Sequence, residues 1–190
     1  MREYESDHSD CSLNAAREVG TLSVTEDLIG DEARSVIGRE TGRSTVVVSK
    51  REFQRWATAV GESNPLYFDA DYALAQGYSD VVAPPLFVQA LMSQAYTPLD
   101  SLRPDGVPGG NGDSMVSIPK CPRLMAGGDR FTFGRPLQDG DVVTIVGSIE
   151  NIEQKTGRKG DFVVITNVVS FQLPDDTEAA RCVSTILALP

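Results

Sequence analysis

Residues 84–95 read Pro-Pro-Leu-Phe-Val-Gln-Ala-Leu-Met-Ser-Gln-Ala, and this stretch decides the fold. Proline has no backbone N–H, so Pro84 and Pro85 can open a helix but cannot continue one. The residues behind them are apolar on almost every side, which is typical of a helix that is buried all round. We therefore predict a hydrophobic helix at the centre of the molecule, with Met92 in the core.

The last third of the chain predicts the layer that wraps this helix. Several segments there are rich in β-branched residues, and turn sequences such as Gln138-Asp139-Gly140 separate them. The predicted strands cover 129–135, 141–152, 161–173 and 179–187, and a shorter one covers 45–48. Long consecutive strands joined by tight turns form an antiparallel sheet. The sequence thus predicts an α+β domain in which a curled antiparallel sheet wraps a central helix.

Shorter helices are predicted ahead of the central one. Ser49 and Glu52 have the spacing of a capping box, which predicts a helix that ends at Gly61. A turn-rich loop follows, in which Asn64-Pro65 fixes a turn. Asp69 is then a candidate cap for a short helix over 71–76.

Charge and composition exclude several classes of partner. The formal net charge of −10 disfavours nucleic acid and anionic membrane surfaces, which both need clustered Lys and Arg. No stretch is apolar enough for a transmembrane helix, and no apolar segment follows the N-terminus as in a secretory signal. The three cysteines are widely and irregularly spaced, which indicates neither a disulfide framework nor a metal site. We expect a cytoplasmic protein.

Residues 1–36 differ from the rest of the chain. They hold nine acidic and three basic residues, so we predict an acidic N-terminal extension over 1–36 and one domain over 37–190. The extension is either a solvated arm or an arm that packs on a partner subunit. It also contains His8, the single histidine of the sequence. Any mechanism that needs an imidazole in a folded pocket must therefore obtain it from another chain.

Three motifs over residues 37–190 resemble the MaoC-like acyl dehydratases and hydratases, which have the hot-dog fold. They are Gly61-Glu62-Ser63-Asn64-Pro65-Leu66-Tyr67-Phe68-Asp69, Asp80-Val81-Val82-Ala83-Pro84-Pro85-Leu86-Phe87 and Arg135-Pro136-Leu137-Gln138-Asp139-Gly140-Asp141. Within that family, the first two motifs are similar to the branch described as the N-terminal half of MaoC dehydratases. Members of that branch commonly pair with a second, catalytic hot-dog half.

The resemblance also implies which residues matter. The family reversibly adds water to an enoyl thioester, using an Asp and a His around one water and a backbone N–H that polarises the thioester carbonyl. On this sequence the Asp position holds Glu62, the His position Tyr67 and the N–H position Pro85. A phenol is a poor base at neutral pH, and proline has no N–H. We therefore predict that these matched positions are catalytically degenerate.

The leading hypothesis is a subunit of a heteromeric (R)-specific 3-hydroxyacyl-thioester dehydratase, or enoyl-thioester hydratase. A second hot-dog subunit would supply the catalytic Asp and His, while this chain shapes the acyl tunnel. Acyl-CoA or an acyl-carrier-protein thioester is the expected substrate, with no cofactor. The predicted substrate-binding residues are Asn64, Ala83, Pro84, Pro85 and Phe87. Two alternatives stay open: a self-sufficient thioesterase or homodimeric dehydratase that uses Glu62, and a non-catalytic module that binds acyl thioesters.

Overall fold

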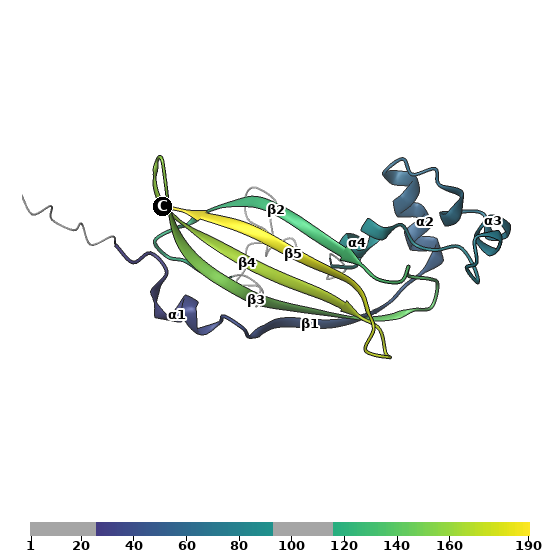
Figure 1. The fold of residues 1–190 in the computed structure, drawn as a ribbon, viewed down its shortest axis with the longest axis horizontal. Coiled ribbons are helices and arrows are strands. Elements are labelled where there is room, and N and C mark those ends of the chain that lie inside the picture. The colour runs from purple at the N-terminus through teal and green to yellow at the C-terminus, as the bar shows by residue number, and fades with distance from the viewer. Residues whose placement is uncertain (1–25, 93–115) are drawn as a thin grey trace, which may run out of the picture.

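A curved sheet of five antiparallel strands forms the body of the molecule (Figure 1). The computed structural model describes residues 26–92 and 116–190. The strands are β1 (Glu40–Val47), β2 (Arg123–Phe133), β3 (Val142–Gly157), β4 (Gly160–Gln172) and β5 (Glu178–Leu189). They lie in the order β1-β3-β4-β5-β2, and every neighbouring pair is antiparallel. The predicted α+β architecture is confirmed.

β2 begins at Arg123, well before the predicted start at residue 129. The glycines at 127 and 128 look like a turn in the sequence. In the structure they form an irregularity inside the strand, between Ala126 and Gly128, and pairing with β5 continues on both sides of it. Gly128 has a φ of +140°, a conformation that favours glycine. The long-range pairing thus overrides the local turn preference.

The central helix lies against one end of the sheet. It starts as a 3₁₀ turn, η2 (Pro85–Phe87), and continues as α4 (Val88–Met92). Phe87 is 2% exposed and packs edge-on against Phe53 and Trp56, with ring centroids 6.1 Å apart in both pairs. Burying a side chain of this kind contributes about 1.5–3 kcal/mol. The predicted helix start is confirmed, while residues 93–95 lie outside the described residues.

The prediction that Met92 lies in the core is wrong, because its side chain is 42% exposed. Leu91 points into the apolar cluster and is 2% exposed. Met92 instead borders a cavity over the middle of the sheet, where Asn167 and Ser184 interrupt the apolar face.

The helices before the central one are held by side chains from loops. α2 spans Lys50–Ala59, η1 Pro65–Tyr67 and α3 Ala70–Ala75. The predicted capping box of α2 is wrong, because the Ser49 side chain makes no capping hydrogen bond. The Lys50 N–H instead donates to the Asp139 carboxylate at 2.6 Å, so the cap comes from the turn before β3. Asp69 caps α3 as predicted, since its carboxylate accepts from the Tyr72 N–H at 3.0 Å.

The described part of the acidic extension packs on its own chain. α1 (Gly30–Ser35) and the residues before it contribute to a second apolar cluster at the far end of the sheet. Leu28, Ile29 and Ala33 are buried there beside Ile118 and Cys121. Residues 1–25, including His8, lie outside the described residues, so the boundary at residue 37 stays a prediction.

Within 26–92 and 116–190, every helix is too short or too polar to cross a membrane.

Candidate functional site

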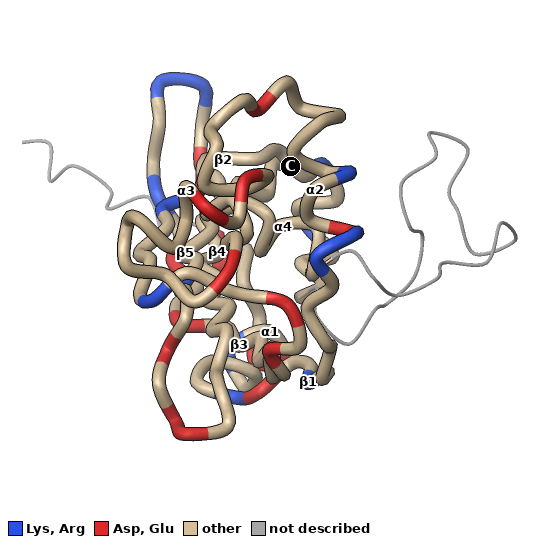
Figure 2. Tube along the Cα trace, turned by 90° about the vertical axis from the view of Figure 1, so that its right-hand side faces the viewer, with Lys and Arg blue, Asp and Glu red and all other residues tan. Residues whose placement is uncertain are grey.

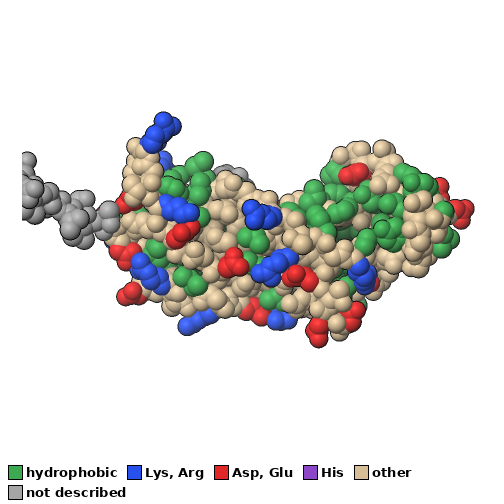
Figure 3. Space-filling model, viewed as in Figure 1, with side chains coloured by type: hydrophobic (Ala, Val, Ile, Leu, Met, Phe, Trp, Pro, Cys, Tyr) green, Lys and Arg blue, Asp and Glu red, His purple; other side chains and the backbone are tan. Residues whose placement is uncertain are grey.

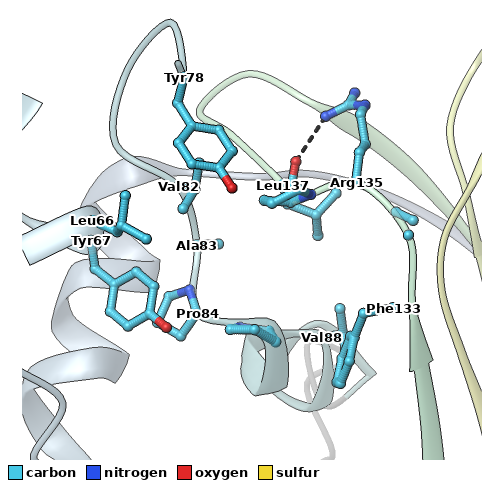
Figure 4. A pocket seen from close by; sticks show the side chains of 14 residues that line it. Leu66, Tyr67, Tyr78, Val82, Ala83, Pro84, Val88, Phe133, Arg135 and Leu137 are labelled. Carbon is cyan, nitrogen blue, oxygen red and sulfur yellow. Dashed lines mark hydrogen bonds between the residues drawn. The ribbon is translucent and has the colours of Figure 1, made fainter. Parts of the chain in front are cut away.

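A pocket of about 180 Å³ lies between the start of the central helix and the end of β2 (Figure 4). One wall comes from the loop with η1 and from residues 82–88, and the other from residues 133–137. Figure 3 shows that hydrophobic side chains gather over this end of the molecule. The lining residues are Leu66, Tyr67, Tyr78, Val82, Ala83, Pro84, Pro85, Val88, Phe133, Gly134, Arg135, Pro136, Leu137 and Ala179.

The loop that carries Tyr67 is fixed by local hydrogen bonds. Gly61 ends the preceding helix with a φ of +77°, which few residues other than glycine adopt. The Asn64 side chain accepts from the Leu66 N–H at 3.0 Å, and the Tyr67 carbonyl accepts from Gln54 Nε2 at 2.9 Å. These bonds cap η1 and hold the Tyr67 ring against the core, where it is 8% exposed.

The environment of Tyr67 keeps its phenol protonated. Burial raises the pKa of Tyr67 above its ordinary value of 10.0, and the nearby Glu62 carboxylate raises it further, while the Asn64 side chain acts in the opposite direction. A phenol with a raised pKa is a hydrogen-bond donor at neutral pH, and it cannot serve as a base. In Figure 4 the side chains of Tyr67 and Tyr78 both point into the pocket.

The prolines leave this wall of the pocket short of N–H donors. Pro84 is buried and Pro85 is exposed, and neither carries a backbone N–H. Two nearby N–H groups already have acceptors: Ala83 donates to the Leu137 carbonyl at 2.8 Å, and Phe87 donates to the Pro84 carbonyl at 2.9 Å. An acyl carbonyl beside Pro85 would therefore meet no N–H from that residue.

An ion pair braces the opposite wall. The Arg135 guanidinium donates to both Asp141 carboxylate oxygens, at 2.8 and 2.9 Å, and Asp141 also accepts from the Gln138 N–H at 2.7 Å. Burial works to raise the pKa of Asp141, but the bonds from Arg135 and Gln138 hold it below its ordinary value. Because the guanidinium is engaged in this way, Arg135 shapes the pocket wall more than it offers free charge.

The structure brings together four of the seven predicted site residues: Tyr67, Ala83, Pro84 and Pro85 line the pocket. Glu62 and Asn64 are exposed and do not line it, and Phe87 lies in the core behind it. The functional roles assigned to all seven stay predictions.

Sequence reasoning missed Tyr78, Phe133 and Arg135 as pocket residues. Arg135 stands in one of the motifs that carry the family resemblance, and its ion-pair partner Asp141 ends the same motif. The presence of both residues in one motif was the signal that could have indicated Arg135. Tyr78 and Phe133 stand in no motif. They reach the pocket only because the chain folds back, and local sequence does not show this.

Taken together, the lining is mostly apolar, with two phenols as its polar groups besides the engaged Arg135. Such a pocket suits the apolar part of an acyl group, and its phenols can donate hydrogen bonds to a carbonyl oxygen.

Comparison with known proteins agrees with the fold. A family model described as "FAS1-like, dehydratase domain region" matches residues 35–173. Two solved structures from Mycobacterium tuberculosis are similar: the ChsH1–ChsH2 complex and a C-terminally truncated HadBC (3R-hydroxyacyl-ACP dehydratase) complex. For the first, the TM-score is 0.57 at 23% identity, covering 78% of this chain and 85% of that chain. For the second, the TM-score is 0.59 at 21% identity, covering 80% of this chain and 97% of that chain.

Relatives in sequence point to the same group. A UPF0336 protein of Streptomyces coelicolor is 30% identical over 136 residues, which are 72% of this chain and 78% of that protein. A UPF0336 protein of Streptomyces avermitilis is 32% identical over 114 residues, and the chain spans 65% of its length. A probable enoyl-CoA hydratase alpha subunit of Thermomonospora curvata is 29% identical over 127 residues, covering 63% of this chain and 39% of that protein.

The curled antiparallel sheet with its helix defines a hot-dog protein. Because the family model covers more than half of the chain, the protein belongs to this dehydratase-domain family.

Proposed function

We propose that the chain is the non-catalytic subunit of a heteromeric (R)-specific 3-hydroxyacyl-thioester dehydratase, or enoyl-thioester hydratase. A second hot-dog subunit supplies the catalytic Asp and His, and this chain completes the dimer and shapes the acyl tunnel. Hydration places the water hydroxyl on C3 of the enoyl group and a proton on C2. One group must take a proton from water and another must deliver one to C2.

The observation that carries the proposal is Tyr67. It occupies the position of the family histidine, and burial keeps its phenol protonated. The other two catalytic positions support the same conclusion, because Glu62 is exposed outside the pocket and Pro85 has no N–H. These features also weigh against a self-sufficient enzyme based on Glu62.

One of the two edges of the described sheet supports a partner subunit. β2 is an edge strand, paired with β5 alone among the described strands, and ten of its eleven residues are exposed. Leu124, Met125 and Phe133 are 40%, 54% and 43% exposed. A long edge strand that exposes large apolar side chains in this way can pair with another strand, although Arg123, Asp129 and Arg130 on it are charged. The two similar structures are titled as complexes, and the relative from Thermomonospora curvata is named an alpha subunit.

The experiment is to co-express the chain with a hot-dog protein that carries Asp and His in the corresponding loop, and to measure crotonyl-CoA hydration. Replacing the partner's catalytic histidine by alanine should reduce the rate by about 10²–10⁴. The change Tyr67→Phe in this chain keeps the ring and should leave the rate within about threefold, because the phenol transfers no proton in the proposal. A loss of hydration in Tyr67→Phe as large as the histidine loss would contradict the proposal.

A further inference from the structure

We propose that a cleft at the far end of the sheet binds the 3′-phospho-ADP portion of a CoA thioester, an inference that rests on the proposed function. The cleft is open, with a volume of about 750 Å³, and lies where the β3–β4 hairpin meets the start of β2 and the end of β5. Its lining residues are Arg123, Met125, Gly157, Arg158, Lys159, Gly160, Asp161, Phe162, Leu189 and Pro190.

Three cations line this cleft, in a chain whose net charge is −10. Arg158 and Lys159 form the two-residue turn between the paired Gly157 and Gly160, so both stand at the hairpin tip (Figures 2 and 3). Arg123 reaches the same cleft from β2. In the part of the chain that the structure describes, none of the three is ion-paired to a carboxylate.

The acidic residue of the cleft is already engaged. Asp161 accepts from Thr156 Oγ1 at 2.6 Å with one oxygen and from Gln154 Nε2 at 3.1 Å with the other. These neutral donors hold the Asp161 carboxylate away from an ion pair with the cations, so the cleft has three cations against one carboxylate. Arginine and lysine are the side chains that bind phosphate, the first through two parallel hydrogen bonds.

Between the cations lies apolar surface. Phe162 is partly buried and its ring packs against Gly157, where an added Cβ would come within 3.2 Å of it. Met125, Leu189 and Pro190 extend this surface. An aromatic base can stack on such a platform, while its phosphates reach the cationic rim. The combination matches an adenine nucleotide better than a simple anion.

The acidic chain favours CoA over an acidic carrier protein. Surface charges act over about 10 Å at ordinary ionic strength, so a small anion in the cleft interacts with its three cations and Asp161 more than with the acidic remainder of the chain. A carrier protein would spread its negative surface over the acidic remainder of the chain and be repelled. Its prosthetic arm also presents one phosphate and no base.

The position of the cleft suits a thioester bound in the partner. The eleven residues of β2 span roughly 35 Å, with Arg123 at one end and Phe133, which lines the Tyr67 pocket, at the other. Antiparallel edge pairing with a second hot-dog subunit places the start of β2 beside the end of the partner's edge strand. The cleft would then flank the partner's active pocket, not this chain's own.

The test compares Arg158→Gln/Lys159→Gln with Arg51→Gln/Arg55→Gln, a control that removes two exposed cations from α2 at the opposite end of the chain. Titration of the full chain with free CoA and with 3′,5′-adenosine bisphosphate should show about tenfold weaker binding for the hairpin variant and no change for the control. In the active complex, the hairpin variant should raise the KM for crotonyl-CoA about tenfold and leave the KM for crotonyl-pantetheine unchanged.

The outcomes separate this site from the proposed function. Suppose that the complex is active and that the hairpin variant changes neither CoA binding nor either KM. The proposed CoA site is then wrong, and the proposed subunit function is retained. If no complex is active but the hairpin variant loses CoA binding, the proposed CoA site is retained and the proposed subunit function is wrong. A variant that impairs use of an acyl carrier protein while CoA kinetics stay unchanged overturns the CoA assignment.

Discussion

A phenol at position 67 can donate a hydrogen bond but cannot take a proton from water at neutral pH. Its burial strengthens that limit, because a phenolate would lose hydration inside the pocket. Pro85 adds a second deficit, since it withholds an N–H from the wall where a thioester carbonyl would lie. In the proposed reaction the two positions serve different steps, so repairing either one alone would leave the other deficit in place.

We therefore expect Tyr67→His alone to leave crotonyl-CoA hydration by the isolated chain at background. The imidazole would still lack an acid of the right length at position 62 and a polarising donor at 85. Adding Pro85→Gly and Glu62→Asp should give a gain far larger than the sum of the single changes, because groups that act as a unit are not additive. Full activity from Tyr67→His alone would show that the carbonyl-binding site was never lost.

The Arg135–Asp141 pair makes a prediction about pH. The folded pKa of Asp141 lies below its ordinary 3.8, so the pair stabilises the fold above that pH and the contribution is lost as pH falls through the folded pKa. Asp141→Asn should cost about 1–2 kcal/mol in the free energy of unfolding at pH 7, with the difference from the wild type shrinking below pH 4.

Urea unfolding at several pH values measures this, with Glu153→Gln as the control. Glu153 pairs with Lys155 on the surface, so its replacement should cost less than about 1 kcal/mol. Equal losses in the two variants, or a difference at Asp141 that does not depend on pH, would refute the role given to the pair.

At the scale of elements, the start of α2 is set by a residue far away in the sequence. The helix N-terminus carries unsatisfied N–H groups, and Asp139 satisfies that of Lys50. Asp139→Ala should therefore lower stability by about 1 kcal/mol, whereas Ser49→Ala should be nearly neutral, although Ser49 is the residue that the sequence pattern favours. Thermal unfolding of the two variants decides between the two caps, and a larger loss for Ser49→Ala would contradict the structure.

The elements differ in how far local sequence predicts them. The strands β3, β4 and β5 and the proline start of the central helix follow from patterns within each segment. The cap of α2, the early start of β2 and the pocket residues Tyr78 and Phe133 depend on segments that meet only after folding. Of the candidate site, the loop with Tyr67 and the Ala83–Pro85 wall could be predicted, because family motifs mark both. The facing wall over 133–137 overlaps the third motif, but the sequence did not indicate that this motif lines a pocket.

At the scale of the whole molecule, a pocket without a catalytic base occurs together with an exposed edge strand, β2. The described residues contain no histidine, and β2 is an exposed edge strand that carries large apolar side chains at Leu124, Met125 and Phe133. Both features fit a chain that is completed by another subunit. A net charge of −10 would in turn oppose pairing between like copies.

The most direct test is a titration of activity. A fixed amount of a hot-dog partner that carries Asp and His is mixed with increasing amounts of this chain, and crotonyl-CoA hydration is followed. We predict background rates for this chain alone, low rates for the partner alone, and a rate that rises and saturates at one chain per partner. Robust hydration by this chain alone, in protein free of any second subunit, would contradict it.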